Sequence, residues 1–453
     1  MLQDHAIVIG ASISGLITAH MLSQHYGRVS VLERDSLPEA GDFRAGVPQG
    51  RHVHLLLIRG ARELETLFPG INQELQDLGA QSVDMINDCR YYLKNGWTVP
   101  QPTELKTLSA TRPLFDWAIR RRLLQNLKIQ FLAQHDALNL IGNSRHIQGV
   151  QVRNRQDGSE QSLHADLVVD ASGRNSKLAE WLAELGCGKV SETVLDAKLG
   201  YTSRLYAKPE GWNEWKGLFV MQQPPTVPKG AILLEVEGNR WIVTGGGVNQ
   251  AKPPTDEDGF MQWLRELPSP ILADLLSKSQ PLSPTSGYGR TENRQRHYER
   301  MHLPAGIIAL GDAVCAFNPV YGQGISTATL GAILLGNQLK QQDRGSAAWG
   351  QRFQQVLAKN NQFPWEMASG EDSRYDSSFK RPLLSKLIAP YFDQINQASL
   401  NSNVVFSEFI KTIHMIGNPN ALFHPRVFIP VLLSKIRPKY SDAVPNLPLQ
   451  VNV

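Results

Sequence analysis

Three short segments of this 453-residue chain combine glycine with small or acidic residues, the types that let a backbone approach a phosphate or a sugar. Each segment directly follows an apolar run that predicts a buried strand. The segments are Gly10-Ala11-Ser12-Ile13-Ser14-Gly15, then Asp170-Ala171-Ser172-Gly173-Arg174, and then Gly311-Asp312-Ala313, which is followed by Asn318-Pro319 and Gly322-Gln323-Gly324-Ile325. One such pattern alone is a weak signal, but three in this order predict a single site for FAD.

The first segment has the features of a pyrophosphate-binding turn. Gly10 is expected to make the tight turn out of the strand, and Gly15 to let the following helix pack closely on the sheet. Ser12 replaces the usual middle glycine and is still small, and Ser14 stands beside Gly15 at the helix start. Free N–H groups and the partial positive charge of that helix start would hold the pyrophosphate.

Two carboxylates are placed to bind sugar hydroxyls of the same cofactor. Glu33 closes the second strand, where a carboxylate accepts hydrogen bonds from the adenosine ribose and repels a 2′-phosphate. We include its neighbour Arg34 among the cofactor-binding residues. Asp312, beside Gly311, is placed to bind the ribityl hydroxyls of a flavin.

The third segment also opens a helix. Pro319 breaks the chain, and Gly322, Gly324 and Ile325 lead into a helix predicted over residues 326–339. Its positive end would face the N1–C2=O region of a flavin, where charge develops on reduction, and would favour the reduced form.

The elements around these segments predict an α/β fold. A strand at 5–9, a helix at 14–25 and a strand at 28–33 form the nucleotide-binding half of a Rossmann-like, doubly wound sheet. Alternating runs within 190–290 predict an inserted antiparallel sheet for the substrate, and the chain ends in a helical region. We expect FAD-binding parts at 1–80, 111–189 and 291–345, a substrate-side excursion at 81–110, a substrate domain at 190–290 and the C-terminal helices at 346–453.

Composition limits the class of protein. Apolar residues make up 42% and charged residues 19%, as in globular proteins, and no apolar run approaches the length of a membrane span. A net charge of +4 argues against nucleic acid as a partner. Cys89, Cys187 and Cys315 have no metal-binding spacing, so we expect no metal and a reduced, cytoplasmic setting. Because the first strand begins almost at once, we expect no signal peptide.

The C-terminal stretch is basic, with eight Lys or Arg and two acidic residues between positions 380 and 440. Apolar clusters alternate with these charges. We favour a helical cap with solvated basic faces over a surface for peripheral contact with an anionic membrane or an acidic partner.

These segments resemble the group A flavoprotein monooxygenases with the para-hydroxybenzoate hydroxylase fold. Within that group the chain is most similar to the flavin epoxidases of polyether biosynthesis, such as the lasalocid epoxidase. The residues that carry the resemblance are Arg44 with Gly46-Val47-Pro48-Gln49, Arg51-His52-Val53-His54, Gly60-Ala61-Arg62, Leu67-Phe68-Pro69-Gly70, Arg112 with Leu114 and Asp116-Trp117, and Gly311 to Pro319 with Tyr321 to Gly324. The resemblance implies flavin contacts from Arg44, Gly46, Val47, Arg112, Ala171 and Gly173.

The sequence lacks two motifs that are found in related flavoproteins. The Trp-x-Trp-x-Ile-Pro signature of flavin halogenases is absent from the sequence. There is no second dinucleotide fingerprint either, because Gly245-Gly246-Gly247 lacks the helix and acid that would complete one. The family resemblance therefore implies that NADPH, or NADH, binds only transiently.

The resemblance also implies a mechanism: NAD(P)H reduces FAD, O2 adds at flavin C4a to give a hydroperoxide, and its distal oxygen passes to the substrate. Epoxidation of an alkene needs positioning and a dry pocket, whereas phenol hydroxylation gains from a base. The sequence nominates no catalytic residue; His52 and His54 could line the flavin or the cavity, although a structural role is favoured for each.

We therefore expect an FAD-dependent monooxygenase that epoxidises an alkene of a large apolar natural product. We expect six apolar or aromatic residues of the insertion to contribute both to its core and to the substrate cavity: Tyr201, Leu205, Trp212, Trp215, Phe219 and Trp241. The alternatives are an aromatic or terpenoid hydroxylase on the same scaffold, a geranylgeranyl-reductase-like enzyme that uses no oxygen, and a non-catalytic flavin-binding electron or assembly protein.

Overall fold

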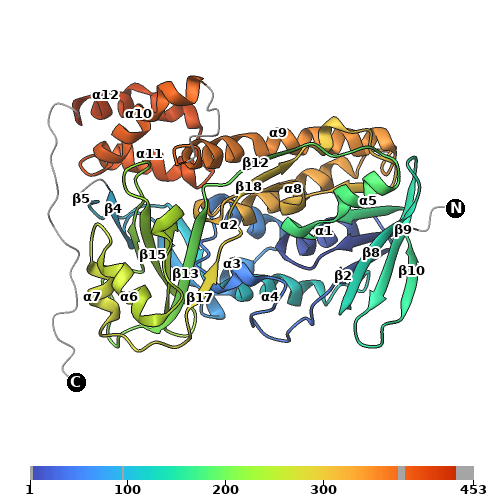
Figure 1. Cartoon of the computed structure of the whole chain (residues 1–453), viewed down its shortest axis with the longest axis horizontal. Helices are drawn as coiled ribbons and strands as arrows, with labels where there is room; N and C mark the ends of the chain where they lie inside the picture. Colours follow the sequence, from blue (N-terminus) through green and yellow to red (C-terminus); the bar gives the residue numbers. More distant parts are fainter. Residues whose placement is uncertain (1–3, 94–95, 376–382, 435–453) are drawn as a thin grey trace. The chain divides into compact units, whose positions relative to one another are not determined.

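The computed structural model describes residues 4–93, 96–375 and 383–434, without the side chains of 383–388 (Figure 1). The chain divides into two compact units, each assembled from three stretches of sequence. The first contains residues 1–48, 113–195 and 292–369, and the second contains 49–112, 196–291 and 370–453.

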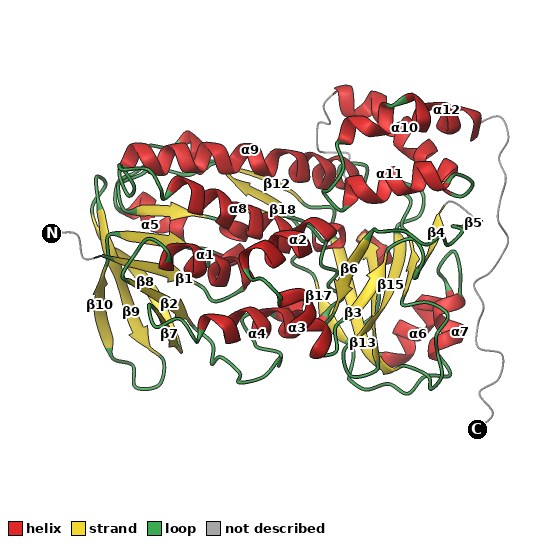
Figure 2. Ribbon diagram, turned by 180° about the vertical axis from the view of Figure 1, so that it is seen from behind, coloured by secondary structure: helices red, strands yellow, loops and turns green. Residues whose placement is uncertain are grey.

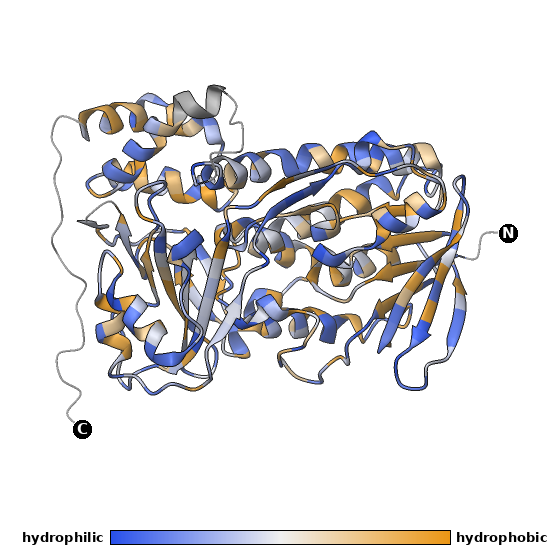
Figure 3. Cartoon of the chain, viewed as in Figure 1, coloured by the Kyte–Doolittle hydropathy of each residue, from blue (hydrophilic) through white to orange (hydrophobic). Residues whose placement is uncertain are grey.

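A five-stranded parallel sheet forms the centre of the first unit. Its strands are β1 (His5–Ile9), β2 (Arg28–Glu33), β7 (Ile129–Ala133), β11 (Leu167–Asp170) and β19 (Ile307–Ala309), in the order β19-β11-β1-β2-β7. Chain order thus reverses on either side of β1, as in a doubly wound sheet. Every residue of β1, β11 and β19 is buried, which requires the continuous apolar runs seen in the sequence and in the hydropathy colours of Figure 3.

Helices and two small sheets complete the first unit. Helix α1 packs on β1 and β2, and α8 packs on α1 so closely that a Cβ on Gly336 would lie 2.0 Å from the Met21 side chain. The helices are α1 (Ile13–Ser23), α4 (Arg112–Leu123), α5 (Leu178–Glu184), α8 (Gly324–Gln338) and α9 (Ala347–Asp372), of which α4 and α9 each cross a boundary between the units. The small sheets comprise β8 (His135–Gly142), β9 (Ile147–Asn154) and β10 (Glu160–His164), and β12 (Glu192–Leu195), β18 (Asn293–Arg296) and β20 (Cys315–Ala316).

The second unit is built on a seven-stranded sheet in the order β17-β13-β16-β15-β14-β4-β5, drawn with the other strands in Figure 2. Its strands are β4 (Cys89–Leu93), β5 (Gly96–Trp97), β13 (Leu199–Ala207), β14 (Gly217–Val220), β15 (Lys229–Val236), β16 (Arg240–Val248) and β17 (Ser286–Tyr288). All neighbours are antiparallel except β14 and β4. The unit also contains the two-stranded sheet β3 (Gln81–Asp84) and β6 (Lys106–Ser109), and the helices α2 (Ile58–Leu67), α3 (Ile71–Asp77), α6 (Glu257–Arg265) and α7 (Ile271–Leu276).

Two hydrophobic cores take up most of the aromatic residues of this unit. One includes Trp212, Trp215 and Trp241 together with residues of α6 and α7. The other includes Leu205 and Phe219 and reaches Ile58 of α2 and Phe406. Five of the six residues expected to contribute to both core and cavity therefore pack in these two cores, and the sixth, Tyr201, is also buried.

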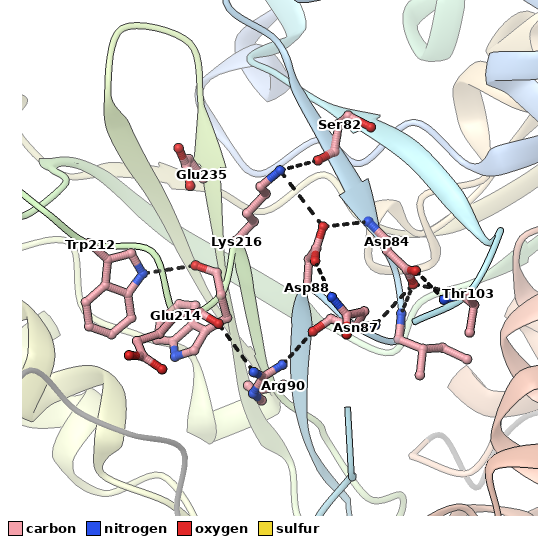
Figure 4. Close-up of polar contacts among 12 residues, drawn as sticks. Ser82, Asp84, Asn87, Asp88, Arg90, Thr103, Trp212, Glu214, Lys216 and Glu235 are labelled. Atoms are coloured by element: carbon pink, nitrogen blue, oxygen red, sulfur yellow. Dashed lines mark hydrogen bonds and ion pairs between the residues drawn. The ribbon is translucent and has the colours of Figure 1, made fainter. Parts of the chain in front are cut away.

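A closed polar network fixes the turn between β3 and β4 (Figure 4). The Asp84 carboxylate accepts hydrogen bonds from the Ile86 and Asn87 N–H groups and from both the N–H and the hydroxyl of Thr103. Lys216 donates to the Ser82 carbonyl at 2.6 Å. Since these acceptors are used within the fold, this acidic cluster has a structural role. Among the described residues, no group of His, Cys, Asp and Glu side chains is arranged to hold a metal ion.

Three helices end the described chain: α10 (Leu383–Ser399), α11 (Asn403–Ile413) and α12 (Pro425–Ser434). Val427 and Val431 of α12 are buried, while large apolar side chains on its other sides are exposed; these are Phe428, Ile429, Leu432 and Leu433. Most of α12 is therefore drawn in the hydrophobic colour of Figure 3. Of the basic residues expected here, only Lys411 and Arg426 have described side chains. No helix in the described part of the chain is both long and apolar enough to cross a membrane.

The observed divisions differ from the expected segments by more than two residues at three places. Residues 190–195 belong to the first unit, where β12 pairs with β18. Residues 49–80 belong to the second unit, because Ile58 packs in its core and Leu55 pairs with Ser109. Residues 346–369 belong to the first unit, where α9 places Gln354 within hydrogen-bonding distance of the Ala309 carbonyl. Just before the second segment the chain forms two short strands that belong to different sheets, because β10 pairs with β9 whereas β11 pairs with β1.

Candidate cofactor site

The three predicted segments meet at one edge of the parallel sheet of the first unit. They follow β1, β11 and β19, which are neighbours in the sheet, and Glu33 ends the adjacent β2. Carboxyl ends of parallel strands, at the point where strand order reverses, are where doubly wound sheets bind nucleotides. The topology therefore brings together residues that are about 300 positions apart in sequence.

Glycines allow these segments to touch. Gly10 has a φ of +104°, and a Cβ there would lie 2.6 Å from the Ala171 carbonyl oxygen. A Cβ on Gly15 would lie 1.8 Å from the Gly10 carbonyl oxygen. Gly311 has a φ of +65°, and a Cβ there would lie 2.4 Å from Ser14 Oγ. No larger residue fits these positions without moving the backbone or Ser14.

Two helix starts carry buried polar atoms without a partner in the described structure. Ser14 Oγ lies in the first turn of α1, whose N-cap residue makes no side-chain capping hydrogen bond. Gln323 Oε1 and Ser326 Oγ lie at the start of α8. Buried polar atoms normally find a hydrogen-bond partner. The Ser14 and Ser326 hydroxyls can donate to acceptors such as the phosphates and ring carbonyls of FAD, whereas Gln323 Oε1 can only accept and fits a donor such as a flavin ring N–H.

Glu33 is embedded in a network of its own. Its Oε2 accepts a hydrogen bond from the Ala11 N–H at 2.9 Å and pairs with Arg44 at 2.8 Å, and its Oε1 accepts from the Asp35 N–H at 3.1 Å. Each carboxylate oxygen can accept about two hydrogen bonds, so Oε1 keeps capacity for a ribose hydroxyl. Glu33 therefore also holds the backbone at Ala11 and Asp35 in place, in addition to its predicted role as a ribose ligand.

The contacts of Arg44 are with other residues of the fold. Its side chain is only 6% exposed, donates to the Ala11 carbonyl at 2.8 Å and lies 3.7 Å from Asp116. Burial alone would lower the pKa of Arg44, but the nearby Asp116 and Glu33 carboxylates raise it. The guanidinium therefore remains charged and ties the loop after β1 to the end of β2.

Asp312 keeps an accessible carboxylate beside a half-buried arginine. Its side chain is 34% exposed, and its Oδ2 lies 3.7 Å from Arg174 Nε. Arg174 also donates to the Glu292 carbonyl at 2.7 Å and to the Phe317 carbonyl. Arg174 thus joins the second and third segments beside Asp312, whose role as a ribityl ligand stays a prediction.

Asp170 stabilises the turn of the second segment through hydrogen bonds. It is fully buried and accepts hydrogen bonds from the Ser172 N–H at 3.0 Å and the Ser172 and Ser176 hydroxyls. Burial raises the pKa of its carboxyl. Its role in the structure is to shape the turn that carries Ala171 and Gly173.

The remaining expected cofactor residues are distributed more widely. Gly46 donates its N–H to Asp35 at 2.6 Å, Val47 is buried, and Arg34 is exposed. A Cβ on Gly173 or Gly324 would meet no atom within 4 Å, so both border open space. Pro319 begins a short 3-10 helix (Pro319–Tyr321), and Gly322 ends that helix. Ile325 is buried in α8. Arg112 is buried at the first position of α4. Arg112 is assigned to the second unit, and the cofactor role of each of these residues stays a prediction.

Sequence reasoning overlooked Arg174 and Ser326 as parts of the site. The available signal for Arg174 was its position as the last residue of the second segment, where an arginine can donate to carbonyls of two loops. In the sequence, Ser326 is only a polar residue near a predicted helix start, and such residues are common there because they cap helices.

The two histidines singled out in the sequence lie in the second unit. His52 is 5% exposed, and burial lowers its pKa to about 3. His54 is half-buried, and burial, with the nearby Arg112 charge, lowers its pKa to about 4. Both imidazoles are therefore neutral at pH 7 and are weak bases.

The family model described as "FAD binding domain" (FAD_binding_3) matches residues 4–367 of the chain. The chain belongs to this family of FAD-binding proteins. Protein Rv3254 of Mycobacterium tuberculosis is 32% identical over 433 residues, which cover 92% of this chain and 90% of that protein. The family match confirms the prediction of an FAD-dependent flavoprotein enzyme and supports the resemblance to the group A flavoprotein monooxygenases.

Solved structures share the fold at low sequence identity. The flavin-dependent brominase Bmp2 superposes with a TM-score of 0.68 at 13% identity, covering 95% of this chain and 99% of Bmp2. The p-nitrophenol 4-monooxygenase PnpA of Pseudomonas putida superposes with a TM-score of 0.63 at 16% identity, covering 91% of this chain and 98% of PnpA. These likenesses confirm the predicted fold class.

Replacing Asp312 with Ala should weaken FAD binding by about 1.5–3 kcal/mol, the usual contribution of a hydrogen bond to a charged group. The affinity of apoprotein for FAD, measured by flavin fluorescence, reports the change. Asp274→Ala, which changes an exposed carboxylate on α7, is the matched control and should leave FAD affinity unchanged. Wild-type affinity in Asp312→Ala would remove Asp312 from the site. Glu33→Ala is a less direct test, because it also leaves the buried Arg44 without its nearest carboxylate.

Proposed function

We propose that the chain is an FAD-dependent monooxygenase that uses NADPH or NADH and O2 and epoxidises an alkene of a large apolar natural product. The observation that carries the proposal is the meeting of three loops at the reversal point of the parallel sheet, with partnerless buried polar atoms at two helix starts. FAD, when bound, supplies the chemistry of hydride acceptance and oxygen activation. We also propose a cytoplasmic setting, in which the three free thiols would stay reduced.

The residues of the first unit would divide the cofactor between them. The turn from Gly10 to Gly15 and Ser14 Oγ would hold the pyrophosphate, and Glu33 the adenosine ribose. Asp312 would hold the ribityl chain. Gln323 and Ser326 would meet the polar edge of the ring at the positive end of α8.

Epoxidation is favoured over hydroxylation of a phenol by the protonation state of the two histidines that could line the flavin or the cavity. A base that deprotonates a ring hydroxyl works best when its pKa lies near the working pH. Burial lowers the pKa values of His52 and His54 to about 3 and about 4, so neither fits that task. An alkene needs no deprotonation, only positioning and exclusion of water.

The proposed apolar substrate is supported by two aromatic rings beside His52. The Tyr201 and Tyr288 ring centroids lie 6.0 and 5.5 Å from the His52 imidazole. Such rings supply flat apolar surface with polar groups at their edge.

Incubation with candidate polyenes, NADPH and ¹⁸O2, followed by mass spectrometry, tests the proposal. We expect one labelled oxygen atom in an epoxide product and O2 uptake coupled to NADPH oxidation. Label from water instead of O2 would contradict the monooxygenase reaction. Turnover of phenols but not alkenes would transfer the assignment to the hydroxylase alternative, and saturation of the double bond without O2 uptake to a geranylgeranyl-reductase-like activity.

A further inference from the structure

A polar cluster at one end of the seven-stranded sheet has no part in the cofactor site. His52, Ser203 and Thr244 lie together in the second unit, where β13 and β16 pair Ser203 opposite Thr244. All three residues are at most 8% exposed. Tyr201 lies two positions before Ser203 on β13 and so shares its face of the sheet.

Hydrogen bonds link these three side chains in a row. His52 Nδ1 lies 2.6 Å from Ser203 Oγ, and Ser203 Oγ lies 2.6 Å from Thr244 Oγ1. The backbone N–H of Val53 donates to Thr244 Oγ1 at 2.8 Å. The row therefore starts at a backbone donor and ends at the imidazole.

The direction of the hydrogens follows from counting donors. If the Thr244 hydroxyl donates to Ser203, then Ser203 can donate to His52 Nδ1, and every hydroxyl hydrogen is used. In the reverse direction His52 Nδ1 would donate to Ser203 and Ser203 to Thr244. The Thr244 hydrogen would then have no acceptor in the described structure. Since an unmade buried hydrogen bond costs free energy, the first direction is favoured.

This direction places the imidazole hydrogen on Nε2. A neutral imidazole carries one hydrogen, and Nδ1 is the acceptor here. Burial keeps His52 neutral by lowering its pKa to about 3. In the described residues Nε2 has no protein partner, and the ring that bears it is flanked by Tyr201 and Tyr288.

His54 has the opposite arrangement and serves as an internal comparison. Its Nδ1 lies 3.0 Å from the His52 carbonyl, which can only accept, so the His54 hydrogen is on Nδ1. Two neutral histidines two positions apart are thus held in different tautomers.

We propose that His52 is a specificity-determining residue whose Nε2–H donates a hydrogen bond to an oxygen acceptor of the substrate, such as a carbonyl or ether, lying against the Tyr201 and Tyr288 rings. A ligand group that could only donate would reverse the row and leave the Thr244 hydrogen unpaired. The role as a substrate contact rests on the proposed function, whereas the tautomer does not depend on it.

The tautomer is tested first, by NMR of FAD-loaded protein labelled with ¹⁵N-histidine. We assign the signals with His52→Phe and His54→Gln. We expect His52 as the Nε2–H tautomer and His54 as the Nδ1–H tautomer, and Ser203→Ala should abolish the preference at His52 only. Nδ1–H at His52 in the wild type would overturn the proposal.

Binding is tested with 1-indanone, an aromatic ketone, and indane, which has the same rings without the oxygen. 1-Indanone should shift the His52 Nε2–H signal and should bind at least tenfold more weakly to His52→Phe, while indane should bind both proteins equally. The exposed-site variant His302→Gln should behave as wild type. Equal binding of 1-indanone to wild type and His52→Phe, or no shift up to its solubility limit, would overturn the contact. These measurements use neither NADPH nor O2, so failure of the monooxygenase reaction would be seen separately in the ¹⁸O2 experiment.

Discussion

Protein carrying Gly15→Ala should be purified without FAD and should unfold at a lower temperature than the wild type. The added Cβ would lie 1.8 Å from the Gly10 carbonyl oxygen, which is backbone and cannot rotate away. Helix α1 would have to move off the sheet, at a cost of about 1–3 kcal/mol. Because the same movement opens the pyrophosphate turn, FAD affinity should fall by at least about 100-fold. Flavin absorbance of the purified protein and a thermal melt measure the two effects.

Gly370→Ala is the matched control for this substitution. Gly370 lies in α9, and a Cβ there would meet nothing within 4 Å. Alanine is the better helix former by about 0.5–1 kcal/mol, so the control should keep FAD and melt slightly higher. A yellow Gly15→Ala protein with unchanged melting temperature would show that the contact between Gly10 and Gly15 is not needed.

Stability should fall steeply as the pH drops from about 6.5 towards 4. Burial lowers the pKa values of His52, His54 and His414 from 6.5 to about 3, about 4 and about 3. All three are neutral in the folded protein, whereas the unfolded chain binds their protons below pH 6.5. Protonation therefore favours unfolding throughout this window, and above it these groups contribute no pH dependence. Three extra protons in the unfolded chain correspond to a slope of about 4 kcal/mol per pH unit. Urea unfolding at pH 7, 6 and 5 measures it.

His414→Gln should reduce this slope by about one proton, or about 1.4 kcal/mol per pH unit. His414 Nδ1 accepts a hydrogen bond from the Ile58 N–H at 3.2 Å, and the glutamine carbonyl can replace it. The exposed His302→Gln should leave the slope as in the wild type. Parallel stability curves for wild type and His414→Gln would show that His414 takes up its proton in the folded state as well.

The sequence predicted the first unit well because its signals are local. Apolar runs ending in Gly10, Asp170 and Gly311 are the carboxyl ends of β1, β11 and β19, and each helix or strand of the opening β-α-β unit lies within two residues of its expected bounds. A continuous apolar run followed by glycine is typical of a buried parallel strand at a ligand. The order of the three segments along the chain was then enough to predict that they form one site.

Other features depended on partners far away in the chain. Nothing near residues 49–80 shows that Ile58 packs in the second unit, since its partners there include Ile410. Trp212 and Trp241 are equally compatible with a core and with a cavity until α6 and α7 are placed against them. The row from Thr244 to His52 spans 192 positions, and a serine and a threonine on two strands carry no local signal of a shared hydrogen bond.

The order of strands in the parallel sheet also has a consequence for synthesis of the chain. Strand β1 is made first, and β2 can pair with one of its edges almost at once. Its other edge waits for β11, which is complete only at residue 170, and β11 waits for β19 at residues 307–309. At roughly 5–20 residues per second, each delay lasts on the order of ten seconds. During that time an apolar strand presents unpaired N–H and C=O groups, the form of edge that invites wrong pairing between nascent chains. Slowly translated or truncated forms that end before residue 307 should therefore aggregate, and efficient production should depend on chaperones that cover this edge.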